Sequence, residues 1–88
     1  MRELHFMPKA WKDLGWWMQN DLKAVKKIHY LLEIICKTPF SGLGEPEPLR
    51  ADYAGYWSRR INQMHRIVYK VEEKRIIVHS LYGHYSDK

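Results

Sequence analysis

The sequence predicts an α+β domain in which a short N-terminal strand and a helical hairpin pack on an antiparallel C-terminal sheet, as two layers. Three observations predict this class. Apolar residues recur at helical spacing between residues 8 and 37, and polar and apolar residues alternate in the C-terminal third. A chain of 88 residues is also long enough for one core only. We therefore expect residues 1–88 to form a single domain.

The first helix is preceded by a short strand. Alternation from Glu3 to Phe6 indicates the strand, and Pro8 suits the first turn of a helix, where its missing N–H is not needed. The buried stripe of this helix is expected to consist of Trp11, Leu14, Trp17 and Met18. Trp16 cannot face the same way, so it is either covered by a neighbouring loop or part of a partner surface.

The second helix is expected to begin after Asn20, whose side chain can cap it. Its apolar face is expected to consist of Leu22, Val25, Ile28, Leu32 and Ile35. Pro39 disfavours helical geometry at Thr38 and so ends the helix. The short connection before Asn20 makes the two helices an antiparallel hairpin. Cys36 is the single cysteine and is expected to be a small buried core residue.

The C-terminal half is predicted to be a loop followed by strands. Prolines and glycines exclude regular structure from Pro39 to Pro48. The expected strands are Tyr56 to Ile61, His65 to Val71 and Arg75 to Tyr82. If the first hairpin is centred on Gln63, one side of it packs on the helices. That side would carry Trp57, Ile61, Ile67, Tyr69 and Val71. Arg59 and His65 fall on the same side and would have to reach its rim.

This register places Arg60 directly opposite Arg66, whereas a slip of one residue would separate them. Like charges opposite one another destabilise a sheet, so the pair favours a bound anion. RNA phosphate is the natural candidate, because a guanidinium binds it through two hydrogen bonds. The alternative is that one arginine forms a salt bridge with Glu45, Glu47 or Asp52.

The C-terminal half also holds the groups needed to cut RNA without a metal. The guanidinium groups for phosphate are those of Arg50, Arg59, Arg60 and Arg66. Glu47 stands between two prolines that restrict its backbone, and its carboxylate can accept a proton from a ribose 2′-hydroxyl. His84 could act as a general acid and Tyr85 could stack on a base. The alternatives are an exposed loop glutamate and a frayed chain end.

The formal net charge of +5 attracts polyanions, either nucleic acid or an acidic protein. The lysines of the second helix form either a solvated face or a phosphate-docking stripe; they are Lys23, Lys26 and Lys27. The histidines show no ligand spacing with Cys36 or with acidic residues, so we expect no metal and no cofactor. The N-terminus lacks a signal-peptide pattern and the longest apolar run is too short to span a bilayer. We expect a cytoplasmic protein.

Four segments of the sequence resemble a known family. They are G-E-P-E-P-L-R from Gly44 to Arg50, G-Y-W-S-R-R-I from Gly55 to Ile61, H-R-I-V-Y from His65 to Tyr69, and the closing H-Y. Together they resemble the YoeB branch of the RelE superfamily, and the resemblance covers nearly the whole chain. Those proteins are toxins of bacterial toxin–antitoxin pairs that cleave messenger RNA on the ribosome.

The resemblance implies a RelE-like two-layer fold and a metal-independent endoribonuclease, an mRNA interferase. By that likeness Glu47 would be the general base and His84 the general acid. Arg60 and Arg66 would clamp the phosphate and the transition state, and Tyr85 would orient and stack the substrate. Arg50 stands where such proteins often carry lysine, which keeps the charge and changes the donor geometry.

The resemblance also implies partners. These are the ribosome with its messenger RNA, and a cognate YefM-like antitoxin whose acidic, partly disordered segment wraps the basic surface. A homodimer is a further option, and no membrane partner is expected. Two departures from the family pattern are Gly83, where a larger residue is expected, and the extension Ser86-Asp87-Lys88.

Two other readings stay open from the sequence. One is a non-catalytic relative that binds RNA or an antitoxin, which would not require Glu47 and His84. The other is a gyrase-poisoning relative of the same fold, which would have little use for the glutamate, arginine and histidine set.

Overall fold

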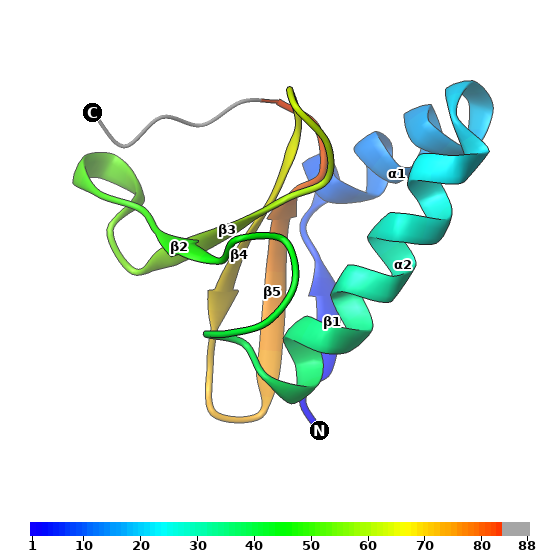
Figure 1. Ribbon diagram of the computed structural model, residues 1–88. Helices are drawn as coiled ribbons and strands as arrows, with labels where there is room; N and C mark the ends of the chain where they lie inside the picture. The colour runs from blue at the N-terminus through cyan, green and yellow to red at the C-terminus, as the bar shows by residue number, and fades with distance from the viewer. Residues whose placement is uncertain (84–88) are drawn as a thin grey trace.

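The computed structural model describes residues 1–83 and contains one sheet of five strands in the order β1-β5-β4-β3-β2. The elements are β1 (Glu3–Phe6), α1 (Pro8–Asn20), α2 (Leu22–Lys37), β2 (Glu47–Pro48), the short 3-10 helix η1 (Ala51–Tyr53), β3 (Tyr56–Arg60), β4 (Arg66–Val71) and β5 (Arg75–Ser80). The two helices lie side by side against one face of the sheet (Figure 1). The α+β class with a helical layer and a sheet layer is therefore confirmed.

The sheet is mixed rather than purely antiparallel. β1 pairs in parallel with β5, with Glu3 beside Arg75 and Phe6 beside Val78, while the other neighbouring strands are antiparallel. The N-terminal strand is thus an edge of the same sheet and not a separate element packed on it. The helical hairpin carries the chain across one face of the sheet, from β1 at one edge to β2 at the other (Figure 1).

The buried stripe of α1 differs from the prediction. Ala10 and Trp17 are buried and Leu14 is half-buried, whereas Trp11 and Met18 are exposed. The stripe therefore runs along positions 10, 14 and 17, which are spaced by four and three residues as a helix face requires. The Trp17 indole Nε1 donates to the Leu81 carbonyl at 2.7 Å, which turns this side of α1 toward the end of β5.

The start of α2 is capped by Asp21 and not by Asn20. The Asp21 carboxylate accepts a hydrogen bond from the Ala24 N–H at 3.1 Å, and Asn20 is the last residue of α1. The predicted core positions Ile28, Leu32 and Ile35 are buried, but Leu22 in the first turn is exposed. The helix ends at Lys37 before Thr38 and Pro39, as predicted. Cys36 is buried, which raises the pKa of its thiol.

The predicted register of the β3–β4 hairpin is confirmed, because Arg60 pairs with Arg66 and Trp57 with Tyr69. Ile61, Ile67 and Tyr69 are fully buried against the helices. The loop that begins at Pro39 ends earlier than predicted, because Glu47–Pro48 form β2 and pair with Ser58 and Trp57. This pairing attaches Glu47 to the sheet. Neither helix in the described part of the chain is long and apolar enough to cross a membrane.

Candidate functional site

Arg66 lies at the centre of a charged cluster on the sheet face turned away from the helices. Only 9% of its side chain is exposed. Its Nε donates to Ser58 Oγ at 2.8 Å, and Nη2 donates to the Glu45 carbonyl at 3.1 Å. Ser58 is itself fully buried. The guanidinium group is therefore held in one orientation by neutral partners from β3 and from the loop before β2.

Glu47 reaches the same guanidinium from β2. The Glu47 carboxylate Oε1 lies 3.7 Å from Arg66 Nη2, and 52% of the glutamate side chain is exposed. Glu47 pairs with Ser58 in the ladder, which places both side chains on the open face with Arg66. A charge-assisted hydrogen bond is usually about 2.7–2.9 Å long, so this ion pair is loose. The result is an accessible carboxylate beside a fixed, nearly buried guanidinium.

The second arginine of the pair is more open. Arg60 Nε lies 3.7 Å from Glu45 Oε2, and 40% of the Arg60 side chain is exposed. Both members of the Arg60–Arg66 pair thus have a carboxylate nearby, which is the salt-bridge alternative considered for the sequence. Because surface pairs of this length contribute little, the two carboxylates offset only part of the repulsion between the arginines.

Arg59 does not belong to this surface, so the prediction that it binds phosphate is wrong. Its side chain is fully buried on the opposite side of β3. The guanidinium donates to the carbonyls of Thr38, Ser41 and Leu43 and to the Tyr69 hydroxyl. These bonds occupy the group within the protein and leave it unexposed to a ligand.

The remaining predicted residues come from other elements or lie outside the described region. Arg50 is exposed at the start of η1. All three predicted docking lysines, Lys23, Lys26 and Lys27, are exposed on α2, in the helical layer rather than on the open face. His84 and Tyr85 lie outside the described residues. Gly83, directly before His84, accepts from the Arg66 N–H at 3.0 Å and donates to His65 Nδ1 at 3.0 Å.

The chain matches the model of the family described as the YoeB-like toxin of bacterial type II toxin–antitoxin systems, over residues 6–85. The chain belongs to this family. It is 43% identical to Toxin YoeB of Synechocystis sp. over 83 residues, which covers 94% of this chain and 96% of the relative.

Two similar solved structures come from Staphylococcus aureus. The YoeB dimer has a TM-score of 0.89 at 42% identity and covers 96% of this chain and 98% of its own. The heterotetrameric YoeB–YefM toxin–antitoxin complex has a TM-score of 0.87 at 42% identity and covers 97% of this chain and 99% of its own. The resemblance inferred from the sequence is therefore confirmed, and so is the fold that it implied.

Three residues near the site were not among the predicted site residues. Ser58 orients Arg66, Glu45 contributes both a carbonyl and a carboxylate, and the His65 ring accepts the Gly83 N–H. Strand alternation places Ser58 on the same face as Arg60, but it does not show that Ser58 orients Arg66. Glu45 was expected only as an alternative salt-bridge partner, because the hydrogen bond from Arg66 to its carbonyl depends on an irregular loop in which its φ is 53°.

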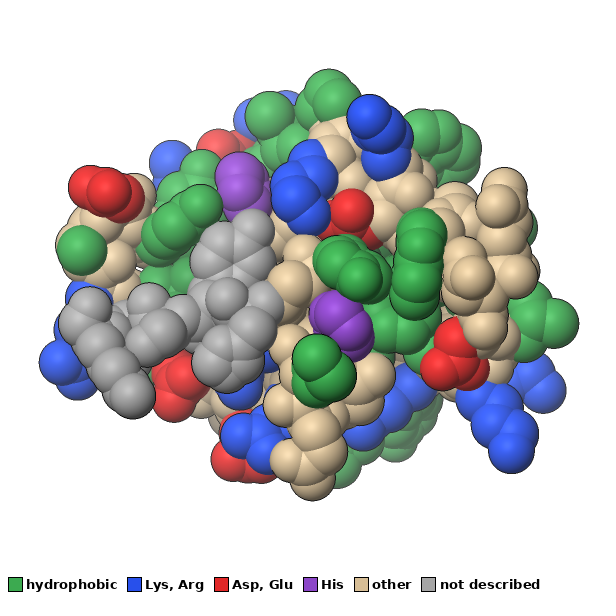
Figure 2. Space-filling view, turned by 90° about the horizontal axis from the view of Figure 1, so that it is seen from above, with side chains coloured by type: hydrophobic (Ala, Val, Ile, Leu, Met, Phe, Trp, Pro, Cys, Tyr) green, Lys and Arg blue, Asp and Glu red, His purple; other side chains and the backbone are tan. Residues whose placement is uncertain are grey.

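Trp16, for which two readings were open, is partly covered and partly exposed. Its ring packs edge-on against Trp17 and Tyr82, with centroids at 5.1 and 4.8 Å. The Tyr82 ring in turn lies 4.3 Å from the His65 ring. Exposed hydrophobic side chains gather beside a histidine at this end of the molecule (Figure 2).

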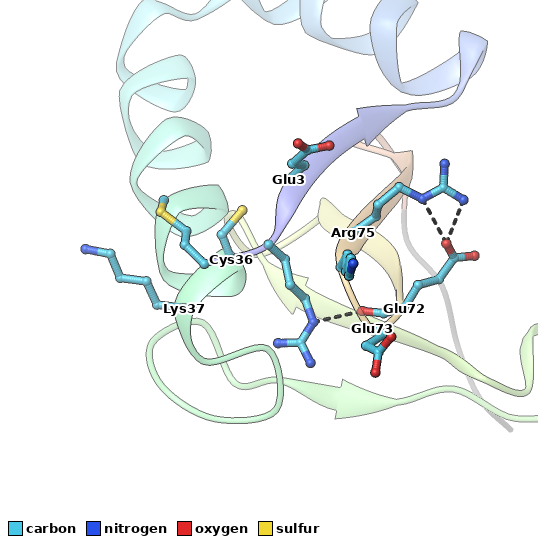
Figure 3. A pocket seen from close by; sticks show the side chains of 9 residues that line it. Glu3, Cys36, Lys37, Glu72, Glu73 and Arg75 are labelled. Atoms are coloured by element: carbon cyan, nitrogen blue, oxygen red, sulfur yellow. Dashed lines mark hydrogen bonds and ion pairs between the residues drawn. The ribbon is translucent and has the colours of Figure 1, made fainter.

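A large hollow lies away from the Arg66 cluster. It has a volume of about 1010 Å³ and is lined by residues from the N-terminus, the end of α2 and the β4–β5 turn. Two of its arginines are hydrogen-bonded within the protein, Arg75 to the Glu72 carboxylate and Arg2 to the Glu72 carbonyl (Figure 3). Among residues 1–83, no group of three or more histidine, cysteine or acidic side chains is placed to hold a metal ion.

Proposed function

We propose that this toxin is a metal-independent endoribonuclease that cleaves messenger RNA at the open face of the sheet. The observation that carries the proposal is the pairing of Glu47 with Arg66. An accessible carboxylate stands 3.7 Å from a nearly buried guanidinium that two other groups of the protein, the Ser58 hydroxyl and the Glu45 carbonyl, hold in place. This is the combination that a proton acceptor and a phosphate ligand require.

The proposed reaction is attack of a ribose 2′-hydroxyl on the adjacent phosphate. Glu47 takes the proton of the 2′-hydroxyl while the 2′-oxygen forms a bond to phosphorus. The bond from phosphorus to the 5′-oxygen breaks, and a general acid protonates that oxygen. We assign this role to His84, which lies outside the described residues. The products are a 2′,3′-cyclic phosphate, or a 3′-phosphate after hydrolysis, and a free 5′-hydroxyl.

The arginines would act on the charge that builds up on phosphorus-bound oxygens in the transition state. Arg66 is pre-oriented by Ser58 and the Glu45 carbonyl, so little reorganisation is needed when that charge appears. Arg60 stands opposite it and is exposed enough to bind a second oxygen or a neighbouring phosphate. Arg50 would contribute positive charge nearby, and Tyr85 would stack on a base.

Cleavage is proposed to depend on the ribosome. The net charge of +5 favours binding to ribosomal RNA, and the exposed Lys23, Lys26 and Lys27 on α2 are the proposed docking residues. Because these lysines and the Arg66 cluster lie in different layers, the toxin could bind ribosomal RNA and the message at the same time. The toxin would then act in the cytoplasm, where translation takes place.

A YefM-like antitoxin is the proposed inhibitor, because the S. aureus relative at 42% identity forms a YoeB–YefM heterotetramer. The S. aureus YoeB dimer supports a homodimer for this chain as well. An acidic partner would complement the net positive charge.

The test of the proposed function is Glu47→Gln, which keeps the size of the side chain and removes the proton acceptor. Cleavage of ribosome-bound message, followed by primer extension, is expected to fall by roughly 10²–10⁴-fold. Glu73→Gln is the matched control, because Glu73 is an exposed glutamate in the β4–β5 turn. Ribosome association should stay unchanged in both variants. Wild-type cleavage by Glu47→Gln would refute the assignment of the base. Absence of cleavage by the unaltered toxin would favour a non-catalytic relative.

A further inference from the structure

Arg59 is a fully buried arginine that donates hydrogen bonds to four neutral oxygens of the described residues. Nη2 donates to the carbonyls of Thr38 and Ser41 at 2.6 and 2.7 Å. Nη1 donates to the Leu43 carbonyl at 3.0 Å, and Nε donates to the Tyr69 hydroxyl at 3.2 Å. Burying a charge is costly unless it is hydrogen-bonded, so such an arrangement persists only when the bonds are well made. Three of the four bonds go to one loop.

Tyr69 completes the same network from β4. Its hydroxyl accepts from Arg59 and donates to the Pro39 carbonyl at 2.7 Å, and the residue is fully buried. Burial raises the pKa of the Tyr69 hydroxyl, which the nearby Arg59 opposes only in part. The hydroxyl therefore keeps the proton that it donates to Pro39. Arg59 and Tyr69 together bind four carbonyls of the segment 38–43.

The segment lies so close to Arg59 that it must contain glycine. Gly42 has a φ of +108°, and a Cβ there would lie 3.3 Å from Arg59 Nη1 and 3.2 Å from Ile34 Cγ2. Gly44 has a φ of +94°, and a Cβ there would lie 3.2 Å from Leu31 Cδ2. Residues other than glycine rarely adopt such φ values. The loop is thus shaped to fit around the guanidinium and the helix.

The same loop leads directly into the charged cluster on the other face of the sheet. The Gly44 carbonyl accepts from the Arg60 N–H at 2.7 Å, and the Glu45 carbonyl accepts from Arg66 Nη2 at 3.1 Å. Glu47 follows two residues later, in β2. The chain is therefore held from the helix side at residues 38–43 and from the open side at residues 44–47.

We propose that Arg59 and Tyr69 are positioning residues for the Glu47–Arg66 site. They hold the segment 38–43 from inside the protein, so that the Glu45 carbonyl and the Glu47 carboxylate meet the Arg66 guanidinium. This inference rests on the proposed ribonuclease function. It gives a role to Arg59, a buried arginine that no ligand can reach, in the site that contains Arg66.

The first test is Tyr69→Phe, which removes a single hydroxyl and leaves the ring in the core. Tyr30→Phe, on the exposed face of α2, is the matched control. In the purified toxin, amide hydrogens of residues 38–46 are expected to exchange faster in Tyr69→Phe than in the control. On ribosome-bound message, kcat should fall by roughly tenfold, the value of one lost hydrogen bond, while KM changes little.

The second test is Arg59→Lys, with Arg75→Lys as its control in the exposed Arg75–Glu72 pair. A lysine keeps the charge but cannot reproduce the fork that reaches three carbonyls. We expect a larger loss of kcat than in Tyr69→Phe, again with ribosome association unchanged. If Arg59→Lys fails to fold, the Tyr69→Phe result decides the question alone.

A merely structural role would lower the thermal unfolding midpoint and the yield but leave kcat per folded molecule at the wild-type value. That outcome in Tyr69→Phe, or unchanged exchange in residues 38–46, would overturn the inference. Failure of the proposed function has a different signature. If the proposed function is wrong, Glu47→Gln cleaves no less than the wild type does. If only the positioning inference is wrong, Glu47→Gln is inactive while the Tyr69 and Arg59 variants cleave like the wild type.

Discussion

Arg59 and Arg60 are adjacent in sequence and identical in type, yet they lie on opposite faces of β3 and have opposite surroundings. Arg59 is fully buried and bonds carbonyls and a hydroxyl. Arg60 is 40% exposed and has one loose carboxylate partner at 3.7 Å. The alternation of a strand has turned one arginine into an internal support of a loop and left the other available for a ligand. Charge alone therefore does not identify a phosphate-binding residue.

Arg66 combines features of both. Like Arg59 it is buried and oriented by hydrogen bonds, and like Arg60 it lies on the open face beside a carboxylate. A guanidinium that is fixed and still reaches the surface is what transition-state stabilisation requires. The comparison among the three arginines leads to four expected results, from the largest effect to the smallest.

Arg59→Met should destabilise the protein strongly, because it leaves several buried oxygens without a donor. We expect the free energy of unfolding to fall by about 3–5 kcal/mol, as for other buried charged networks that lose one partner. Arg60→Met should change it by less than about 0.5 kcal/mol, since that side chain is exposed. Urea denaturation of both variants measures the difference. Equal losses would mean that the two faces do not differ as described.

Arg66→Ala should reduce cleavage by roughly 10²–10³-fold, the usual effect of removing one donor to transition-state charge. Arg66→Lys should recover message binding better than rate, because a point charge cannot reproduce the guanidinium fork. Single-turnover cleavage and equilibrium binding on the same ribosome complexes separate the two quantities. Equal rescue of binding and rate would indicate that Arg66 acts only through long-range charge.

Charge reversal at Lys23, Lys26 and Lys27 together should weaken ribosome association by roughly 10–100-fold at low salt, and the difference should shrink as salt rises. Weak cleavage of free RNA should not change, because α2 lies in the other layer. Pelleting with ribosomes at several salt concentrations measures the first effect. Salt-independent association, or an equal loss of free-RNA cleavage, would show that these lysines are not the docking residues.

Glu45→Gln should have the smallest effect. Its side chain pairs with Arg60 at 3.7 Å on the surface, and such pairs contribute about 0–1 kcal/mol. The Glu45 carbonyl, which binds Arg66, is kept in this variant. Cleavage should therefore stay within roughly threefold of the wild type. A loss as large as that of Glu47→Gln would exchange the roles of the two glutamates.

The sequence predicted the register of the hairpin well, and it named two residues, Glu47 and Arg66, that the structure brings together. The register centred on Gln63 follows from local alternation, and it brought Arg60 opposite Arg66 as the structure has it. The expectation that Glu47 and Arg66 act together is supported by their separation of 3.7 Å. Their chemical roles stay predictions, as do those of His84 and Tyr85.

Features that depend on distant segments were missed. The parallel pairing of β1 with β5 joins residues far apart in the chain, and no local pattern encodes it. Glu47–Pro48 form a strand although two prolines surround the glutamate, because β3 supplies an edge to pair with. For Arg59, alternation indicated the inner side correctly, but the carbonyls that satisfy its charge come from a loop much earlier in the sequence.

The position of β5 has a consequence for when this toxin can become active. β5 is the last strand among the described residues, yet it lies between β1 and β4 and pairs with both. Residues that follow it anchor Trp17 of α1 and the backbone of Arg66. A chain that ends before Arg75 would leave β1 without a neighbour and β4 with an open edge. The strand that carries Arg66 thus obtains its last neighbours only after the residues up to Gly83 have been synthesised, so the Glu47–Arg66 site forms late during synthesis of the chain.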